Sequence, residues 1–139
     1  MITLEYLKES TEEIFDFIGN GFEEYSRANG VLCNWEPFFF TARENGRLMG
    51  VITGHKYYSE VHIGDLLVLK ECRKNRVGTS LLKAVEEHFK DSGIDNINLT
   101  TYAFQAPEFY KKCGFELEYV RENKKEPKLN KMFFVKRFN

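Results

Sequence analysis

The residues best suited to chemistry gather at positions 73–80, where cations precede a glycine and two hydroxyl side chains. In chain order they are Arg73, Lys74, Arg76, Gly78, Thr79 and Ser80. A helix beginning here would present free N–H groups and a partial positive charge, and both favour a phosphate. Cations before a helix N-terminus oppose its dipole by roughly 0.3–1 kcal/mol each. The pattern therefore indicates an anion site rather than ordinary solvated surface.

This segment also resembles a known motif. The run Arg73-Lys74-Asn75-Arg76-Val77-Gly78 is similar to the pyrophosphate-binding signature of GNAT N-acetyltransferases, Arg/Gln-x-x-Gly-x-Gly/Ala. Arg73 fills the first position and Gly78 the last, whereas Arg76 stands where the family usually has a glycine. The resemblance implies that coenzyme A is bound by Arg73, Lys74, Asn75, Arg76, Val77, Gly78 and Thr79.

A second segment strengthens the resemblance. Residues 105–115, Gln-Ala-Pro-Glu-Phe-Tyr-Lys-Lys-Cys-Gly-Phe, look like the family element Ala-x-x-Phe-Tyr-x-x-x-Gly-Phe. The resemblance gives Tyr110 the role of protonating the departing CoA thiolate and places its helix beside the pantetheine arm. Ala103 stands where the family often has an asparagine, so Gln105 is the expected replacement for that pantetheine contact.

The strand before the basic segment completes the expected site. By the resemblance, the backbone of Leu67, Val68 and Leu69 binds pantetheine and the acetyl carbonyl, and an amide there stabilises the developing oxyanion. The reacting amine must also lose a proton. Asp65 is the favoured catalytic base, with His62, Glu60 and a water chain left as alternatives. On a regular strand His62 and Asp65 point to opposite faces, so both face the substrate only if a bulge intervenes.

Cysteine and histidine usage argues against metal and thiol chemistry. Cys33, Cys72 and Cys113 form no CxxC pair, and the histidines lack metal-ligand spacing, so no metal site is expected. No histidine is near Cys113 in sequence, and the end of a helix raises a thiol pKa, so this residue is expected to pack rather than act as a nucleophile.

Length and composition bound the architecture that holds these residues. The chain has 139 residues, of which 42% are hydrophobic, enough for one packed core, so residues 1–139 are expected to form a single domain. The 20 basic and 21 acidic residues argue against a general polyanion binder, hence against nucleic acid. No membrane span or basic-then-apolar signal pattern is present, which predicts a cytoplasmic protein.

The hydrophobic pattern predicts helices and strands in alternating groups. Residues 2–6 alternate as a strand, and Ser10 with Glu13 reads as a capping box for a helix. Asn45-Gly46 predicts a type I′ hairpin turn between strands 38–43 and 48–56. A strand at 61–69 and a polar loop lead to the clearest helix, 77–90, in which Glu86 and Lys90 are expected to pair. Further strands are expected at 96–102, 115–120 and 131–137, and a short helix at 108–113.

This order predicts an α/β (α+β) fold with a mixed, mostly antiparallel central sheet flanked by helices. The resemblance implies a GNAT-like acyl-CoA N-acyltransferase that moves an acetyl group from acetyl-CoA to a primary amine of a small molecule or peptide. Homodimers are common in that family, and the oligomeric state stays open. Two other readings remain: a non-catalytic acyl-CoA-binding module on the same fold, and a nucleotide- or RNA-binding domain that uses the same basic loop.

Overall fold

The computed structural model describes residues 1–138, and its contacts divide the chain into a unit of Met1–Cys33 and a unit that begins at Asn34. Each unit has its own internal contacts. A single domain over residues 1–139 stays a prediction. No helix among residues 1–138 has the length and apolar content required to cross a bilayer.

The first unit consists of one helix, α1 (Glu12–Ala28), and the segments on either side of it. The expected strand at residues 2–6 is wrong, because these residues form no strand in the structure. The capping box of Ser10 and Glu13 is also wrong by one residue. Thr11 is the N-cap, and its hydroxyl accepts a hydrogen bond from the backbone N–H of Ile14 at 3.2 Å.

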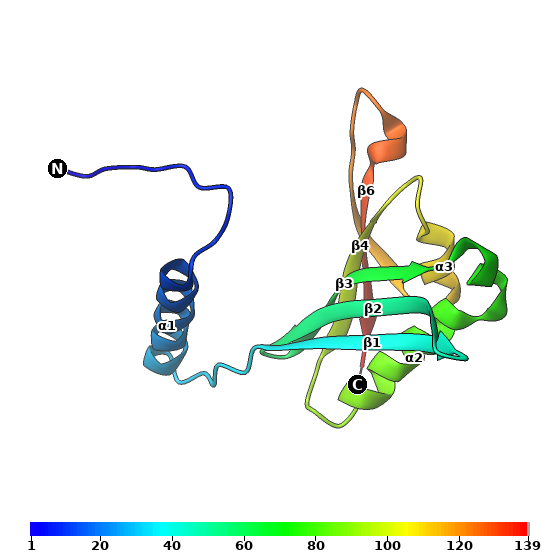
Figure 1. The fold of residues 1–139 in the computed structure, drawn as a ribbon, viewed down its shortest axis with the longest axis horizontal. Helices are drawn as coiled ribbons and strands as arrows, with labels where there is room; N and C mark the ends of the chain where they lie inside the picture. Colours follow the sequence, from blue (N-terminus) through cyan, green and yellow to red (C-terminus); the bar gives the residue numbers. More distant parts are fainter. Residues whose placement is uncertain (139) are drawn as a thin grey trace. The chain divides into compact units, whose positions relative to one another are not determined.

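The second unit is built on a six-stranded sheet in the order β1-β2-β3-β4-β6-β5 (Figure 1). The strands are β1 (Glu36–Glu44), β2 (Arg47–Tyr57), β3 (Glu60–Val68), β4 (Asn96–Tyr102), β5 (Glu116–Arg121) and β6 (Lys131–Arg137). Among the described strands, β3 and β4 pair in parallel and the other neighbouring pairs are antiparallel. The predicted mixed, mostly antiparallel sheet is therefore confirmed.

The hairpin between β1 and β2 forms as predicted. Asn45 and Gly46 have φ angles of 52° and 81°, the left-handed values that both central residues of a type I′ turn require. Asparagine and glycine tolerate this region better than other residues, so the dipeptide determines the position of the turn.

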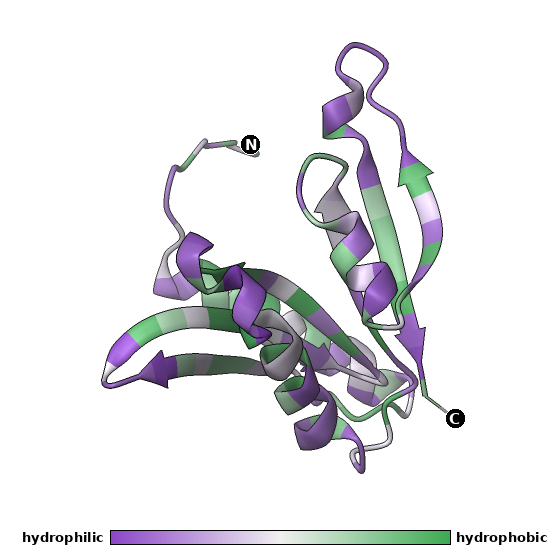
Figure 2. Cartoon of the chain, turned by 90° about the vertical axis from the view of Figure 1, so that its right-hand side faces the viewer, coloured by the Kyte–Doolittle hydropathy of each residue, from purple (hydrophilic) through white to green (hydrophobic). Residues whose placement is uncertain are grey.

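One face of the sheet carries the core. Helix α2 (Val77–Phe89) packs on β1, β2 and β3, and its Leu81, Val85 and Phe89 are buried with Ile52 of β2. Along the strands, hydrophobic and hydrophilic residues form alternating bands (Figure 2). The predicted ion pair between Glu86 and Lys90 does not form. Lys90 pairs instead with Glu87 at 2.9 Å, and Glu86 pairs with Lys136 of β6 at 2.8 Å.

The short helix α3 (Pro107–Lys112) lies on the same face as α2. Its Tyr110 contacts Phe134 of β6, which is fully buried and pairs with the buried Leu99 of β4. Pro107 occupies the first helical position, and Gly114, at φ 92°, follows the end of the helix, so the helix predicted at 108–113 forms one residue earlier. Within residues 34–138 the opposite face of the sheet carries no helix.

Candidate functional site

The sheet opens between its two central strands. Strands β3 and β4 pair only where residues 60–62 lie opposite residues 96–98. Beyond that ladder they diverge (Figure 1), although β2 follows β3 along its whole other edge. The second half of β3 therefore has one edge with no neighbouring strand among the described residues.

Backbone alternation decides which groups point to this open edge. The Leu69 amide donates to the Met49 carbonyl at 2.8 Å, so Leu67, two residues earlier, also directs its backbone groups toward β2. Leu66 and Val68 have the opposite orientation and face the open edge. Of the three residues expected from the sequence, Val68 thus offers a free amide there, and Leu66 is a position that the sequence reasoning missed.

Arg73 is tied to the same edge. Its Nε donates to the Val68 carbonyl at 3.1 Å, which places the guanidinium beside the end of β3. The polar loop expected at residues 70–76 is instead a 3₁₀ helix, η1 (Lys70–Asn75), followed by Arg76 in the left-handed region at φ 60°. A side chain is strained in this conformation and glycine is not, which explains why a related signature would carry glycine at this position.

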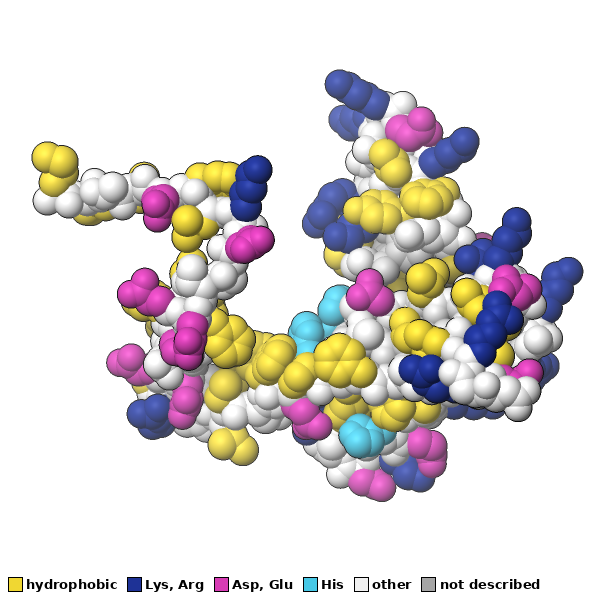
Figure 3. Space-filling view, in the orientation of Figure 1, with side chains coloured by type: hydrophobic (Ala, Val, Ile, Leu, Met, Phe, Trp, Pro, Cys, Tyr) yellow, Lys and Arg dark blue, Asp and Glu magenta, His cyan; other side chains and the backbone are white. Residues whose placement is uncertain are grey.

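Helix α2 begins without a cap. The side chain of its N-cap residue, Arg76, makes no capping hydrogen bond, and its first turn contains no acidic residue. The N–H groups of Val77, Gly78 and Thr79 therefore have no acceptor within the helix. Arg73, Lys74 and Arg76 precede them, and basic side chains are prominent over this end of the second unit (Figure 3). Exposed amides and cations together make a phosphate the best-matched ligand.

Helix α3 lies directly against this turn. A Cβ atom built on Gly78 would come within 3.1 Å of Cζ of Phe109, so the glycine permits close contact between the two helices. Burial raises the pKa of the Cys113 thiol, and a hydrogen bond with Thr79 opposes the rise. A raised thiol pKa disfavours a nucleophile, and Cys113 packs against the core as expected. The two motifs predicted from sequence therefore meet in space.

Tyr110 is buried beside this junction. Only 7% of its surface is exposed, and its ring packs against Phe109, Phe115 and Phe134. Burial, with a smaller contribution from Cys113, raises the pKa of Tyr110 to about 12. The phenol therefore keeps its proton at neutral pH and is available as a donor.

Gln105 turns back toward its own strand. Its side-chain oxygen accepts a hydrogen bond from the Tyr102 amide at 3.0 Å and lies 3.4 Å from Oγ1 of Thr101. This contact closes the end of β4 before α3 begins, so the oxygen is already engaged and only the amide nitrogen is left for another contact.

A bulge in β3 places Asp65, the favoured base, and His62, one of its alternatives, on one face. Asp65 pairs with Thr53 and Ile63 pairs with Gly54, so Gly64 is the extra residue. His62 lies between buried Val61 and Ile63 and points away from the core. The bulge turns Asp65 to the same side, where its Oδ2 accepts a hydrogen bond from Thr53 at 3.2 Å.

On that face an aromatic row crosses the strands. Trp35 lies 6.1 Å from His55, and His55 lies 5.5 Å from His62, measured between ring centroids. Burial, followed by repulsion from His62, lowers the pKa of His55, so this ring is neutral at neutral pH. Histidine and hydrophobic side chains are visible on the exposed sheet (Figure 3).

The row continues into polar side chains that the sequence reasoning missed. Nδ1 of His62 lies 2.7 Å from Oδ1 of Asn98, and Asn98 contacts Asn96 and Glu60. Alternation gave a signal, because Asn96 and Asn98 flank the buried Ile97 and so share the face opposite the core. Their partners come from other strands and could not be identified from spacing.

The comparisons agree on one family. The profile of the acetyltransferase (GNAT) family matches residues 4–115. An uncharacterized N-acetyltransferase of Methanocaldococcus jannaschii is 32% identical over 93 residues, which cover 61% of this chain and 58% of that protein. The crystal structure of an acetyltransferase from Bacillus cereus ATCC 14579 is 28% identical with a TM-score of 0.77, and the match covers 96% of this chain and 98% of that one.

A more distant structure shows the fold alone. The PaiA N-acetyltransferase from Thermoplasma acidophilum, solved with coenzyme A, is 21% identical with a TM-score of 0.62 over 94% of this chain and 81% of that one. The chain spans 49–58% of the lengths of three curated relatives that it matches.

Proposed function

This chain belongs to the acetyltransferase (GNAT) family, and we propose that it transfers an acetyl group from acetyl-CoA directly to a primary amine of a small molecule or peptide. One observation carries the proposal. The uncapped first turn of α2 touches the helix of Tyr110 through Gly78 and Phe109, beside the open edge of β3. An anion-binding turn, a proton donor and free backbone groups thus share one region.

The basic turn is proposed to bind the diphosphate of acetyl-CoA. The amides of Val77, Gly78 and Thr79 supply hydrogen bonds, and the helix dipole adds attraction for negative charge. Arg73, Lys74 and Arg76 add charge, and Asn75 lies in the same turn. Pantetheine then runs along the open edge of β3, where Val68 and Leu66 offer backbone groups.

The transfer itself requires three groups. The neutral amine attacks the thioester carbon, and an amide on the β3 edge stabilises the negative charge that develops on oxygen. As the carbon–sulfur bond breaks, the sulfur takes the electron pair and Tyr110 gives it a proton. A positioned general acid is worth roughly 10²–10⁴ in rate. Asp65 is the base that the sequence favours for removing the proton of the amine, and the alternative His62 lies on the same face of the sheet, opposite the core.

The decisive experiment is a panel of primary amines screened for acetyl-CoA-dependent release of free thiol, with acetyl-CoA binding measured separately by calorimetry. Binding with amine-dependent thiol release supports the enzyme. Saturable binding of acetyl-CoA with no thiol release in the presence of any amine supports the non-catalytic acyl-CoA-binding module. This alternative is considered because Arg76 and Ala103 depart from the family motifs. At a hundredfold excess over Kd, acetyl-CoA should stabilise the fold by about 2.7 kcal/mol.

Parallel thermal shifts with ATP and RNA test the nucleotide- or RNA-binding alternative, which predicts stabilisation by those ligands and none by acetyl-CoA. A homodimer and a cytoplasmic location remain predictions that accompany the proposal. Equilibrium sedimentation checks the first, and cell fractionation checks the second.

A further inference from the structure

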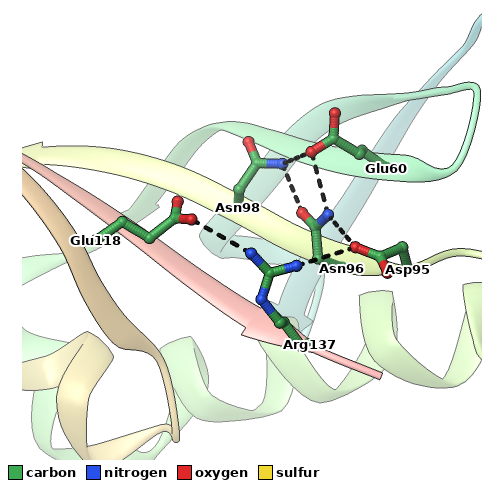
Figure 4. A network of polar contacts seen from close by, with 6 residues as sticks. All are labelled: Glu60, Asp95, Asn96, Asn98, Glu118 and Arg137. Carbon is green, nitrogen blue, oxygen red and sulfur yellow. Dashed lines mark hydrogen bonds and ion pairs between the residues drawn. The ribbon is translucent and has the colours of Figure 1, made fainter. Parts of the chain in front are cut away.

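The polar network beside His62 fixes the orientation of two side-chain amides (Figure 4). Nδ2 of Asn96 donates to Glu60 at 3.1 Å and to Asp95 at 2.9 Å. Nδ2 of Asn98 donates to Oδ1 of Asn96 at 2.9 Å and to Glu60 at 3.3 Å. Turning either amide over would set its oxygen against a carboxylate, so both orientations are determined by charge.

Asp95 and the network are in turn held by an arginine. Arg137 of β6 contacts Asp95 at 3.2 Å and Glu118 of β5 at 3.6 Å. Asn96 is 95% buried, with a relative exposure of 5%, so its hydrogen bonds are shielded from water and hold their geometry. The buried Asn96 therefore has one orientation, and its oxygen orients the amide of Asn98, whose own oxygen is the last member of the network.

That oxygen determines the state of His62. A carbonyl oxygen only accepts, and it lies 2.7 Å from Nδ1, so Nδ1 carries the proton and Nε2 carries the free lone pair. We infer that His62, locked in this tautomer by Asn98, is the group that takes the proton from the acceptor ammonium, and that Asn98 is a positioning residue. The inference rests on the proposed acetyl transfer and assigns its proton acceptor.

A cavity of about 480 Å³ lies at this place, lined by His62 and Asn98 among others. Its volume suits a small amine or the end of a peptide side chain. Three carboxylates and one arginine line it, which leaves an excess of negative charge to attract an ammonium. The ring of His55 lies beside His62, and Asn98 contacts its Nδ1. The charged groups that line the cavity with His62 are Glu60, Asp95, Glu118 and Arg137. Asp65 lies further along β3 on the same face.

The proton balance is simple. The N–H bond of the ammonium breaks, its electron pair stays on nitrogen, and a new N–H bond forms at Nε2 of His62. The neutral amine then attacks the thioester, and as the intermediate collapses its nitrogen loses a second proton, which passes through water to the tyrosinate left when Tyr110 protonates the thiolate. The imidazolium returns its own proton to water. Asp65 competes for this role, but its side chain is exposed, and within residues 1–138 its hydrogen bond is with Thr53 of the neighbouring strand. His62 has a defined tautomer and a place in the cavity wall.

The first test compares variants in the thiol-release assay with the amine that the wild type uses. His62→Gln should lower kcat by roughly 10²-fold or more, with the Kd for acetyl-CoA unchanged. His88→Gln, on the exposed side of α2, is the matched histidine control and should leave kcat unchanged. If Asp65→Asn abolishes activity and His62→Gln leaves it within twofold of wild type, the inference is overturned.

The second test addresses the positioning role through the pH profile. Asn98→Ala should lower kcat roughly tenfold. Asn98→Asp keeps an acceptor beside Nδ1 and should recover part of that loss, while its added negative charge moves the acid limb of kcat to higher pH. A limb that stays at the wild-type pH in Asn98→Asp contradicts the contact. Circular dichroism melts exclude variants that fail to fold.

The third test does not depend on activity. Nitrogen-15 NMR of the imidazole above neutral pH should show His62 protonated at Nδ1 in the wild type and a tautomer mixture in Asn98→Ala. Protonation at Nε2 in the wild type overturns the inference even if the enzyme is active. If no amine yields thiol, the proposed function and the catalytic half of the inference both fail, and the NMR result still decides the tautomer lock.

Discussion

Phe109 of α3 lies so close to Gly78 in the first turn of α2 that a methyl group at Gly78 would come within 3.1 Å of the ring. Gly78→Ala should therefore lower the affinity for acetyl-CoA by roughly tenfold, because the methyl crowds both Phe109 and the amides proposed to bind phosphate. The free energy of unfolding should change little, because the strain of the contact with Phe109 opposes the gain in helix propensity, which is up to about 1 kcal/mol for alanine over glycine. Calorimetry and urea denaturation measure the two effects.

The matched control for this change is Phe109→Leu, alone and combined with Gly78→Ala. Leucine relieves the contact with the ring but leaves the methyl over the amides, so the double variant should stay weak in binding. A double variant that regains wild-type affinity would assign the loss to helix packing instead.

Arg76→Gly should stabilise the protein by about 1 kcal/mol, because Arg76 has a φ of 60° and glycine adopts this region without strain. Arg76→Ala is the control, since it removes the same charge but keeps the strain. Urea denaturation should rank glycine above alanine in stability, and calorimetry should give both variants the same reduced affinity for acetyl-CoA. Equal stability of the two variants would contradict the proposed backbone strain at Arg76.

Gly54→Ala should destabilise the second unit by roughly 1–3 kcal/mol, because the new methyl would collide with the His62 carbonyl and lie 2.7 Å from the buried Phe38 ring. Gly64→Ala is the control: its nearest neighbour would be Thr53 at 3.6 Å, an ordinary contact, so its effect should stay within about 0.5 kcal/mol. Urea denaturation of both variants checks the difference. If the two substitutions change the free energy of unfolding equally, the bulge must adjust freely around β2.

Tyr110→Phe should lower kcat by roughly 10²-fold without changing the Kd for acetyl-CoA, because only the proton donor is lost. Since the pKa of Tyr110 is about 12, the wild-type rate should show no fall from tyrosine ionisation below about pH 11. A pH–rate profile of both proteins tests this.

The same tyrosine predicts a pH dependence of stability. Its pKa is raised on folding, so the stability it contributes is present below its unfolded value of 10.0 and is lost as the pH rises through about 12. Urea denaturation of Tyr110→Phe above pH 10 should show a smaller loss than the wild type. If the two proteins lose the same stability above pH 10, a group other than Tyr110 must be ionising.

Local chemistry accounts for the elements that the sequence predicted well. Asn45-Gly46 determines a turn because few other pairs tolerate two left-handed residues. Val77, Leu81 and Val85 recur at every fourth position, which predicts α2 because residues at this spacing share the buried side of a helix. The strand at 96–102 was predicted with its observed limits. Each of these signals lies within the element itself.

The failures have a common physical reason. Residues 2–6 alternate, but a strand exists only when a neighbour supplies hydrogen bonds, and alternation does not identify that neighbour. The bulge at Gly64 had a signal in an isolated strand glycine, yet its position depends on Gly54 of β2. The contact between His62 and Asn98 spans 36 residues of sequence and is likewise determined by pairing.

The short ladder between β3 and β4 has a mechanical consequence. Three residue pairs join one group of strands, β1, β2 and β3, to the other, β4, β6 and β5, whereas five to nine pairs join neighbouring strands within each group. This boundary has the fewest residue pairs between neighbouring strands of the sheet, so among the strand amides the unpaired ones on the open edge of β3 should exchange fastest. A ligand bound against Val68 would bridge the gap between the two groups of strands. Its binding should therefore reduce their motion relative to one another.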